Sequence, residues 1–519
     1  MGIKFGQKLF QRLKRWKLHQ HVYFSLLAII IGILAGYGAL LFRLVIKIAQ
    51  YAFYQNSQDF ITFAPSVPFY LKIALPALGG LFVGPLVYFG AREAKGHGVP
   101  EVMEAVALRG GQIRPRVAVV QILASGICIG SGGSVGREGP IVQIGSSIGS
   151  TLAQVLRVPH LWQRTMVGCG AAAGIAATFN APIAGVLFAV EVILGEFGVA
   201  IFSPVILASV TATTISRYYL GDFPAFIIPA YQLISLWEFA FYTLLGVTAG
   251  LVALLFITVL YKFEDFFDGL RIPDFIKPVI GGLIIGLILL KWPNVFGVGY
   301  GSINLALKNN MPAMLLLSLV FIKILATSIT IGSGGSGGIF APSLYIGAMT
   351  GGFFGWCMNQ WFPGITASYG AYALVGMGAV VAGTTHAPIT AILIMFELTA
   401  TYKIILPLMI SCILSTLIAT SLKEGSIYTI KLLRRGVDLR RGWEQSILQS
   451  IKIRDIMNHR VETVPENMPL REILSYLKWH DASYLHVVND KGELTGIISF
   501  RDIRPLLQEE VPRGLIIAK

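Results

Sequence analysis

The stretch Gly130–Pro140 is GSGGSVGREGP, and it is nearly repeated as GSGGSGGIFAP at Gly332–Pro342. Seven of the eleven positions are identical, both stretches lie in long apolar regions, and only the first contains an acid, Glu138. Glycine-rich turns that open helices expose free backbone N–H groups, and such groups bind anions. The first question is therefore whether the two loops face each other around one anion.

A second pair of related stretches indicates a duplication. FNAPIAGVLFAVEV at Phe179–Val192 resembles THAPITAILIMFEL at Thr385–Leu398, and each contains a glutamate ten residues after its alanine (Glu191 and Glu397). The two pairs occur in the same order, at offsets of 202 and 206 residues. Such an arrangement is typical of two duplicated halves. Sequence alone leaves open whether the halves are parallel or inverted.

The composition indicates a polytopic membrane protein. Of the 519 residues, 55% are hydrophobic and 13% are charged, whereas soluble proteins carry about 25% charged residues. The apolar run 22–49 is too long for a signal peptide and predicts a first transmembrane helix. Shorter segments bounded by glycine or proline predict broken helices, which often form an ion site near the midplane. These short segments are 117–129, 139–155, 181–194, 338–357 and 387–398.

The charge distribution predicts the topology. The formal net charge is +14, but the basic residues cluster before the first span and after the last. By the positive-inside rule both termini are cytoplasmic, and we expect a multi-pass protein of the cell membrane that contacts lipid rather than nucleic acid. The four cysteines are isolated in apolar segments. Neither a metal site nor the nucleophile–base pair of an enzyme is predicted.

The composition changes after the membrane region. We expect a basic cytoplasmic segment at 1–21, the membrane domain at 22–430, a charged linker at 431–450 and a cytoplasmic α/β unit at 451–519. VETV, YLHVV and ELTGIISF are predicted strands, and PLREILSYLKWH is a predicted amphipathic helix. This unit looks like one CBS repeat, and Leu515–Ala518 looks like the first strand of a second, truncated repeat.

Four segments in order resemble the CLC family of chloride channels and chloride/proton antiporters. They are GHGVPE at Gly96–Glu101, GREGP at Gly136–Pro140, GGIFAP at Gly337–Pro342 and Tyr428 in SIYTIKLL. The resemblance covers about residues 24–430, and a CBS extension is common in the family. It implies an all-α polytopic membrane protein with two inverted halves of broken and tilted helices. It also implies a homodimer with one anion pathway in each subunit.

The resemblance implies which residues lie along the anion path. The backbone N–H groups of Ile339 and Phe340 and the hydroxyl of Tyr428 hold the central anion, because partial charges attract chloride without trapping it. When deprotonated, Glu138 occupies an outer anion site and blocks the path; when protonated or displaced, it opens the path. The alternatives are an acid paired with Arg137 and an interfacial anchor for Tyr428. The anion-path residues are His97, Arg137, Glu138, Gly139, Ile339, Phe340 and Tyr428.

The first departure from the family pattern is His97, which stands where the family usually has a serine that binds the central anion. A neutral imidazole donates through one N–H, whereas a protonated one adds a charge and holds the anion more strongly. Alternatively, the side chain turns away and only the backbone lines the pore. The preference among monovalent anions, such as chloride, nitrate and fluoride, therefore depends on this residue.

The second departure is Val192, which stands where antiporters of the family usually have a proton-accepting glutamate. Valine carries no proton, and channel members often have it. The adjacent Glu191 matches Glu397 of the other half, so it is either a structural acid or a substitute proton carrier. We therefore expect a passive chloride channel gated by Glu138. The alternative is an antiporter that moves protons through Glu138 and then through Glu191, water or His97.

The CBS unit suggests one cofactor and one further alternative. Ser499 and Asp502 fit an S/T-x-x-D pattern whose acid can hold the ribose of an adenine nucleotide between paired repeats, or they form a helix N-cap. No other cofactor is expected. CBS units also regulate cation transporters, which would need acids along the membrane path. The membrane motifs contain few acids and their glycine loops favour anions.

Overall fold

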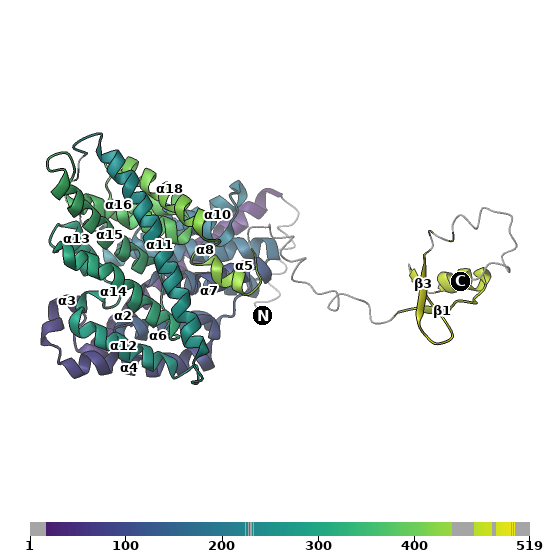
Figure 1. Ribbon diagram of the computed structural model, residues 1–519. Coiled ribbons are helices and arrows are strands. Elements are labelled where there is room, and N and C mark those ends of the chain that lie inside the picture. The colour runs from purple at the N-terminus through teal and green to yellow at the C-terminus, as the bar shows by residue number, and fades with distance from the viewer. Residues whose placement is uncertain are drawn as a thin grey trace. The chain divides into compact units, whose positions relative to one another are not determined.

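The computed structural model describes residues 17–438 except 224, 227, 229, 230 and 232, together with 461–479, 484–499, 501 and 503. The chain divides into two compact units, Met1–Trp443 and Glu444–Lys519. The described part of the first unit is built from helices (Figure 1), and that of the second contains a small sheet. Most of the predicted segment 1–21 and of the predicted linker 431–450 lies outside the described residues.

The helices of the first unit fall into two sets, which follow one another along the chain and correspond to the two predicted halves. The first set is α2 (Lys17–Tyr54), α3 (Phe60–Phe63), α4 (Phe69–Pro85), α5 (Val99–Leu108), α6 (Arg116–Ser131), α7 (Glu138–Val155), α8 (His160–Phe179), α9 (Pro182–Phe188) and α10 (Val199–Leu220). The second set is α11 (Glu238–Gly269), α12 (Lys277–Lys291), α13 (Tyr300–Leu307), α14 (Ala313–Gly332), α15 (Phe340–Trp361), α16 (Tyr369–Thr385), α17 (Pro388–Thr399), α18 (Ile405–Leu422) and α19 (Thr429–Arg434). Short 3₁₀ or π turns follow or precede some of them, at Ala64–Ser66, Leu86–Gly90, Arg92–Ala94, Ala189–Leu194 and Pro293–Val295.

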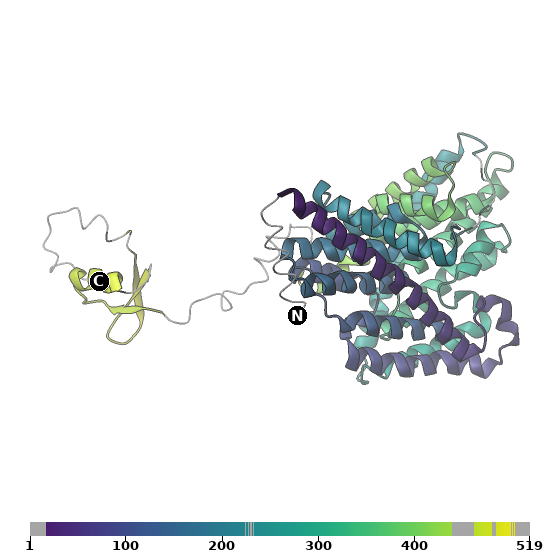
Figure 2. The ribbon, with the colours of Figure 1, turned by 180° about the vertical axis from the view of Figure 1, so that it is seen from behind.

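Six helical segments of the described chain are long and apolar enough to cross a membrane. The first, Val22–Tyr54, begins where the predicted run 22–49 begins and extends beyond its end. The helix α2 that contains it is one long helix along the outside of the unit (Figure 2). A helix can continue past the hydrocarbon region because its backbone hydrogen bonds are internal. Along α2, Phe24 and Ile31 are buried whereas Leu34 and Leu41 are exposed, so one face packs on the protein and the other fits lipid.

The helices α7 and α15 contain 18 and 22 residues, which correspond to about 27 and 33 Å at about 1.5 Å per residue. The helix α7 matches the predicted segment 139–155 to within one residue, and neither α7 nor α15 is among the six segments that are long and apolar enough to cross a membrane. The helix α15 ends at Trp361, beyond the predicted end at 357. It stops just before Pro363, because proline disfavours helix in the residue that precedes it. The helices α6, α9 and α17 are short, as predicted.

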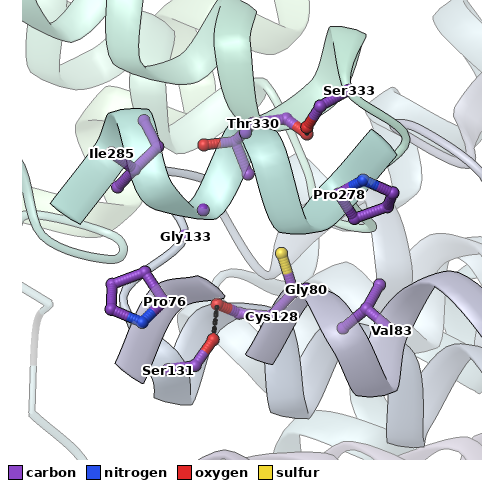
Figure 3. Close-up of a pocket in the computed structure, with 13 residues that line it drawn as sticks. Pro76, Gly80, Val83, Cys128, Ser131, Gly133, Pro278, Ile285, Thr330 and Ser333 are labelled. Atoms are coloured by element: carbon purple, nitrogen blue, oxygen red, sulfur yellow. Dashed lines mark hydrogen bonds between the residues drawn. The ribbon is translucent and has the colours of Figure 1, made fainter. Parts of the chain in front are cut away.

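The duplication is visible in the packing of the helices. The pair α7 and α8 packs as the pair α15 and α16 does, α2 packs on α10 as α11 packs on α18, and α4 packs on α12 between the halves. A small cavity lies where α4, α6, α12 and α14 meet (Figure 3). Its lining joins Pro76 with Pro278, Gly80 with Gly282, Cys128 with Thr330, Ser131 with Ser333 and Gly133 with Gly335, each pair 202 residues apart. Equivalent residues thus face each other across the boundary between the halves.

The second unit contains a three-stranded sheet and a helix. The strands β1 (Thr463–Pro465) and β2 (Tyr484–Val488) are parallel and connected by α22 (Leu470–Trp479), and β3 (Leu494–Ser499) pairs antiparallel with β2. A helical crossover is what a parallel pair requires. The predicted order of strands and helix is confirmed. Asp502 and the predicted strand Leu515–Ala518 lie outside the described residues.

Candidate anion-binding site

The two glycine loops face each other, which answers the question that the sequence raised. The Gly136 N–H donates to the Gly338 carbonyl at 2.7 Å, and the Gly338 N–H donates to the Gly136 carbonyl at 2.6 Å. A Cβ atom on Gly338 would lie 2.7 Å from the backbone nitrogen of Gly139, so only glycine permits this approach. The reciprocal pairing of equivalent residues is the arrangement that a two-fold axis between the halves produces.

A third loop joins this pair. The Gly96 N–H donates to the Gly335 carbonyl, and the Gly337 N–H donates to the Gly96 carbonyl, both at 3.1 Å. The helices α5, α7 and α15 begin directly after these three loops. Each helix N-terminus carries roughly half a positive charge and unpaired N–H groups. The loops therefore hold three helix N-termini within one bonded unit.

The Glu138 side chain lies against the N-terminus of the opposite half. The backbone N–H of Ala341 donates to its Oε2 at 3.3 Å, and the Tyr300 hydroxyl donates to its Oε1 at 3.2 Å. Glu138 is only 1% exposed. The carboxylate thus lies at the first turn of α15. Ile339 and Phe340, which directly precede Ala341, are the residues predicted to hold the central anion.

Arg137 points away from the carboxylate. Its guanidinium lies 5.3 Å from the centre of the Tyr300 ring and donates to the Thr178 carbonyl at 3.4 Å. Among the described residues no ion pair within 4.0 Å joins it to Glu138. The alternative of a direct Arg137–Glu138 ion pair is therefore not supported.

His97 and Tyr428 lie next to each other and form a second part of the site, after the part formed by Glu138 and the start of α15. Their rings are 5.9 Å apart, both residues are 1% exposed, and the Phe188 ring stands edge-on to Tyr428. Neither ring nitrogen of His97 has a hydrogen-bond partner in the part of the chain that the structure describes. A neutral imidazole always carries one N–H donor, so the site holds an unused donor. The burial of Tyr428 argues against an interfacial anchor.

Ion pairs explain why Tyr428 lies next to His97. Tyr428 directly precedes α19, and Lys431 on α19 pairs at 2.8 Å with Glu101 on α5, the helix that follows His97. Arg435 pairs at 2.6 Å with Glu104 on the same helix. The Lys431–Glu101 pair is mostly buried, with side-chain exposures of 12% and 9%. The basic residues after the last span thus also attach α19 to α5.

The two matching acids of the repeats have reciprocal partners. Glu191 accepts hydrogen bonds from the N–H and hydroxyl of Thr390, at 2.7 and 2.6 Å, and from the N–H of Ile389. Glu397 accepts bonds from the N–H groups of Ala184 at 2.7 Å and Ile183 at 3.0 Å. Glu191 therefore lies at the start of α17, and Glu397 lies at the start of α9, where negative charge is favourable.

A cavity of about 290 Å³ lies beside the Tyr428 loop. Val192 and Glu191 line one side of it, and the loop residues Gly425 and Ser426 line another. The full lining is Met103, Glu191, Val192, Thr385, His386, Ala387, Thr420, Lys423, Gly425, Ser426 and Thr429. The position predicted to lack a proton-accepting acid thus borders a space that reaches the chain next to Tyr428.

Tyr300 was not among the residues predicted to lie along the anion path. It is the first residue of α13, it lies 162 residues from Glu138, and its surroundings form no recognised motif. One signal was available, because the 202-residue offset of the repeats relates Tyr300 to Gly98, in the loop that also contains His97. The repeat pattern could therefore have marked this position without indicating what its side chain does.

The sequence matches the family model for voltage gated chloride channels over residues 79–420 and that for the CBS domain over residues 453–509. It is 34% identical over 415 residues to a protein described as ClcB-like from Ralstonia nicotianae, covering 79% of this chain and 96% of that protein. It is 31% identical over 407 residues to the voltage-gated ClC-type chloride channel ClcB of Escherichia coli O9:H4, covering 78% and 97%.

Solved structures share the fold. A slow cyanobacterial Cl⁻/H⁺ antiporter superimposes with a TM-score of 0.73 at 27% identity, covering 80% of this chain and 99% of that chain. A eukaryotic CLC transporter superimposes with a TM-score of 0.66 at 21% identity, covering 96% and 90%. The second likeness concerns the fold alone.

Proposed function

The chain belongs to the CLC family of chloride channels and antiporters and carries a CBS domain after its membrane region, and we propose that it is a passive chloride channel. The observation that carries this proposal is the position of Glu138. Its carboxylate accepts a bond from the first turn of α15, where a helix N-terminus attracts anions. A carboxylate and a chloride ion therefore compete for one place.

This competition provides a gate. A deprotonated Glu138 blocks the path, because its charge keeps it at the N-terminus of α15. Protonation removes that charge and lets an entering anion displace the side chain. Chloride flux should therefore rise as the pH falls. Arg137 and Gly139 flank the gate in the same loop, and a Cβ atom on Gly139 would lie 2.1 Å from the His97 carbonyl oxygen, so the gate adjoins the next level of the path.

The central anion would lie deeper, between the start of α15 and the pair His97 and Tyr428. Backbone N–H groups of Ile339 and Phe340, the Tyr428 hydroxyl and one imidazole N–H would supply the donors. Neutral donors bind the anion weakly enough for release. Chloride is the proposed substrate, and other monovalent anions are further candidates.

The residues at the position of the usual second proton site favour a channel over an antiporter. Val192 cannot carry a proton, and the carboxylate of Glu191 already accepts three hydrogen bonds at the start of α17. One observation favours the antiporter: neither ring nitrogen of the buried His97 has a hydrogen-bond partner among the described residues. His97 could therefore relay protons where the usual acid is missing.

Chloride and proton flux, measured together in liposomes with an imposed chloride gradient, separates the two readings. The channel predicts fast chloride flux with no proton movement against the proton gradient. Uphill proton transport at a fixed ratio to chloride would overturn the channel and support the antiporter. His97→Ser, tested in the same liposomes, then distinguishes the two proton routes, because only a relay through His97 would lose its proton flux.

The remaining parts of the proposal concern assembly and regulation. Apolar side chains exposed on α9, α10, α17 and α18, such as Ile183, Ile389 and Leu417, support a homodimer within the lipid bilayer of the cell membrane. The basic chain ends support cytoplasmic termini. An adenine nucleotide at the CBS domain, near Ser499 and Asp502, would act as a regulator rather than as a required cofactor.

A further inference from the structure

We propose that Tyr300 is a positioning residue for the gate, whose hydroxyl holds Glu138 in the blocking position and sets the pH at which the path opens. The inference rests on the proposed function, since it concerns the same carboxylate. It adds a residue that lies in a different half of the chain and outside every recognised motif.

The hydrogen bonds of Glu138 divide between backbone and side chain. Oε2 accepts its bond from the backbone N–H of Ala341, whereas Oε1 accepts its bond from the Tyr300 hydroxyl. The backbone bond depends on the position of α15 and on no particular side chain. Tyr300 is therefore the side chain, among the described residues, whose substitution removes a donor from the carboxylate and leaves the helix N-terminus intact.

Two neighbours contact the Tyr300 ring. The Arg137 guanidinium lies 5.3 Å from the ring centre, and the Phe226 ring stands edge-on to it with centres 5.3 Å apart. Phe226 is buried and its N–H donates to the Leu398 carbonyl at 3.1 Å. A ring held in this way presents its hydroxyl in one direction, so the donor is oriented before the carboxylate arrives.

The chain leading to Tyr300 is anchored to the gate loop. The Lys323 ammonium, fully buried on α14, donates to the carbonyls of Val295 at 3.2 Å and Gly297 at 2.9 Å. The Ser134 hydroxyl, from the same glycine loop as Glu138, donates to the Val295 carbonyl at 2.7 Å. The chain that leads to Tyr300 and the glycine loop that carries Glu138 are therefore bonded to the same backbone carbonyl, that of Val295. This shared contact holds the backbone on the two sides of the Tyr300–Glu138 hydrogen bond together.

A hydrogen bond donated to a carboxylate favours its charged form. A hydrogen bond to a charged group contributes more stabilising free energy than a bond between neutral groups. The loss of this donor therefore makes protonation of Glu138 easier. Other charged or titratable groups also face the gate. Tyr300→Phe removes none of them, but it takes away the hydroxyl with which Arg137 also interacts. These groups are Arg137 beside it, Lys323 on α14, Tyr428 before α19, and Arg43 on α2, which faces Arg137 and Tyr300.

The test is the pH profile of chloride flux for Tyr300→Phe in liposomes. The variant keeps the ring and its packing against Arg137 and Phe226. Its half-maximal flux should move to higher pH by about one unit, because the gate opens with less acid. Tyr345→Phe is the matched control: this buried hydroxyl donates to the Asn294 carbonyl at 3.3 Å and makes no bond to Glu138. A Tyr300→Phe profile that coincides with the Tyr345→Phe profile would overturn the inference.

A second background separates the inference from the gating proposal. In Glu138→Gln the carboxylate is absent, so adding Tyr300→Phe should change neither the flux nor its pH profile. An equal effect of Tyr300→Phe in both backgrounds would mean that the residue acts on the pore by packing, and the positioning role would be wrong. If Glu138→Gln alone keeps the pH dependence of the native protein, the gate itself is wrong and the role of Tyr300 falls with it.

Discussion

The two glycine loops have nearly the same sequence, but they contribute different groups to the site. They pair symmetrically through Gly136 and Gly338, yet one presents the acid Glu138 where the other presents Phe340. The acid of the first loop lies against the helix that the second loop opens. The duplication therefore produced a symmetric scaffold. In the proposed mechanism, the few positions at which the copies differ supply the blocking acid and the anion site that it blocks.

A second pair of acids gives the contrasting case. Glu191 and Glu397 are retained in both copies, and each accepts hydrogen bonds from the start of a helix in the other half. An acid that both halves retain has the same surroundings twice and holds the halves together. An acid present in only one half, such as Glu138, has no such counterpart, and in the proposed mechanism it is the part that moves.

The largest expected effect is that of Glu138→Gln, which removes the difference between the loops. Above the pH of half-maximal opening, flux of the native protein should fall about tenfold per pH unit, because the protonated fraction of one carboxyl does so. The amide is neutral at every pH, so the variant should conduct with little pH dependence. Chloride efflux from liposomes, measured between pH 4.5 and 8.5, gives this pH dependence. Carboxyl groups in proteins titrate over about this range when their surroundings shift the pKa. Glu196→Gln, an exposed acid paired with Arg164, is the control.

The same substitution at the two paired glycines should have opposite results. A Cβ atom at 136 would meet the Glu138 carboxylate at 2.1 Å, whereas at 338 it would meet the Gly139 backbone nitrogen at 2.7 Å. A side-chain end can swing away and backbone cannot. Gly136→Ala should therefore fold and conduct more at high pH, and Gly338→Ala should lose about 1–3 kcal/mol of stability and most flux. Equal results for the two variants would contradict this reading of the loops.

His97→Ser tests a difference that the repeats do not explain. Serine restores a hydroxyl donor and removes the imidazole, so the ratio of nitrate to chloride permeability should change several-fold, about 1 kcal/mol of relative binding. Anion competition assays on reconstituted protein give this ratio. An unchanged ratio would mean that the side chain does not contact the ion. Ser125→Ala, a buried hydroxyl that bonds Ser336, controls for loss of a polar group near the loops.

The smallest effect on transport is expected from the symmetric acids. Glu191→Gln and Glu397→Gln should each cost about 0.5–2 kcal/mol of stability through weaker bonds to the start of α17 or α9. Thermal unfolding in detergent should give similar losses for both, with chloride flux per folded protein unchanged. If Glu191→Gln alone alters proton flux, the symmetry is broken and Glu191 is a proton carrier.

Much of the architecture could be predicted from the sequence. The family, the all-α membrane fold with two inverted halves and the C-terminal CBS unit are confirmed, because glycine loops, broken apolar segments and strand patterns leave local signals. The end of α15 was predicted at 357 and lies at Trp361, and Gly351 and Gly355 within this helix allow close packing on Tyr372 of α16. A glycine in an apolar segment does not tell by itself whether it ends a helix or lets one approach another.

The sequence by itself determined the duplication, the glycine loops that open helices, and the chemical difference between Glu138 and Phe340. These are local or periodic properties, and each depends on residues close together in the chain or at one fixed offset. Only the tertiary structure decided which backbone N–H donates to the Glu138 carboxylate and that the Tyr300 hydroxyl also donates to it. It also decided that Glu191 accepts hydrogen bonds from the start of α17. Each of these contacts joins residues more than 150 positions apart, and their pairing depends on how the two halves dock through backbone that only glycine permits to approach so closely.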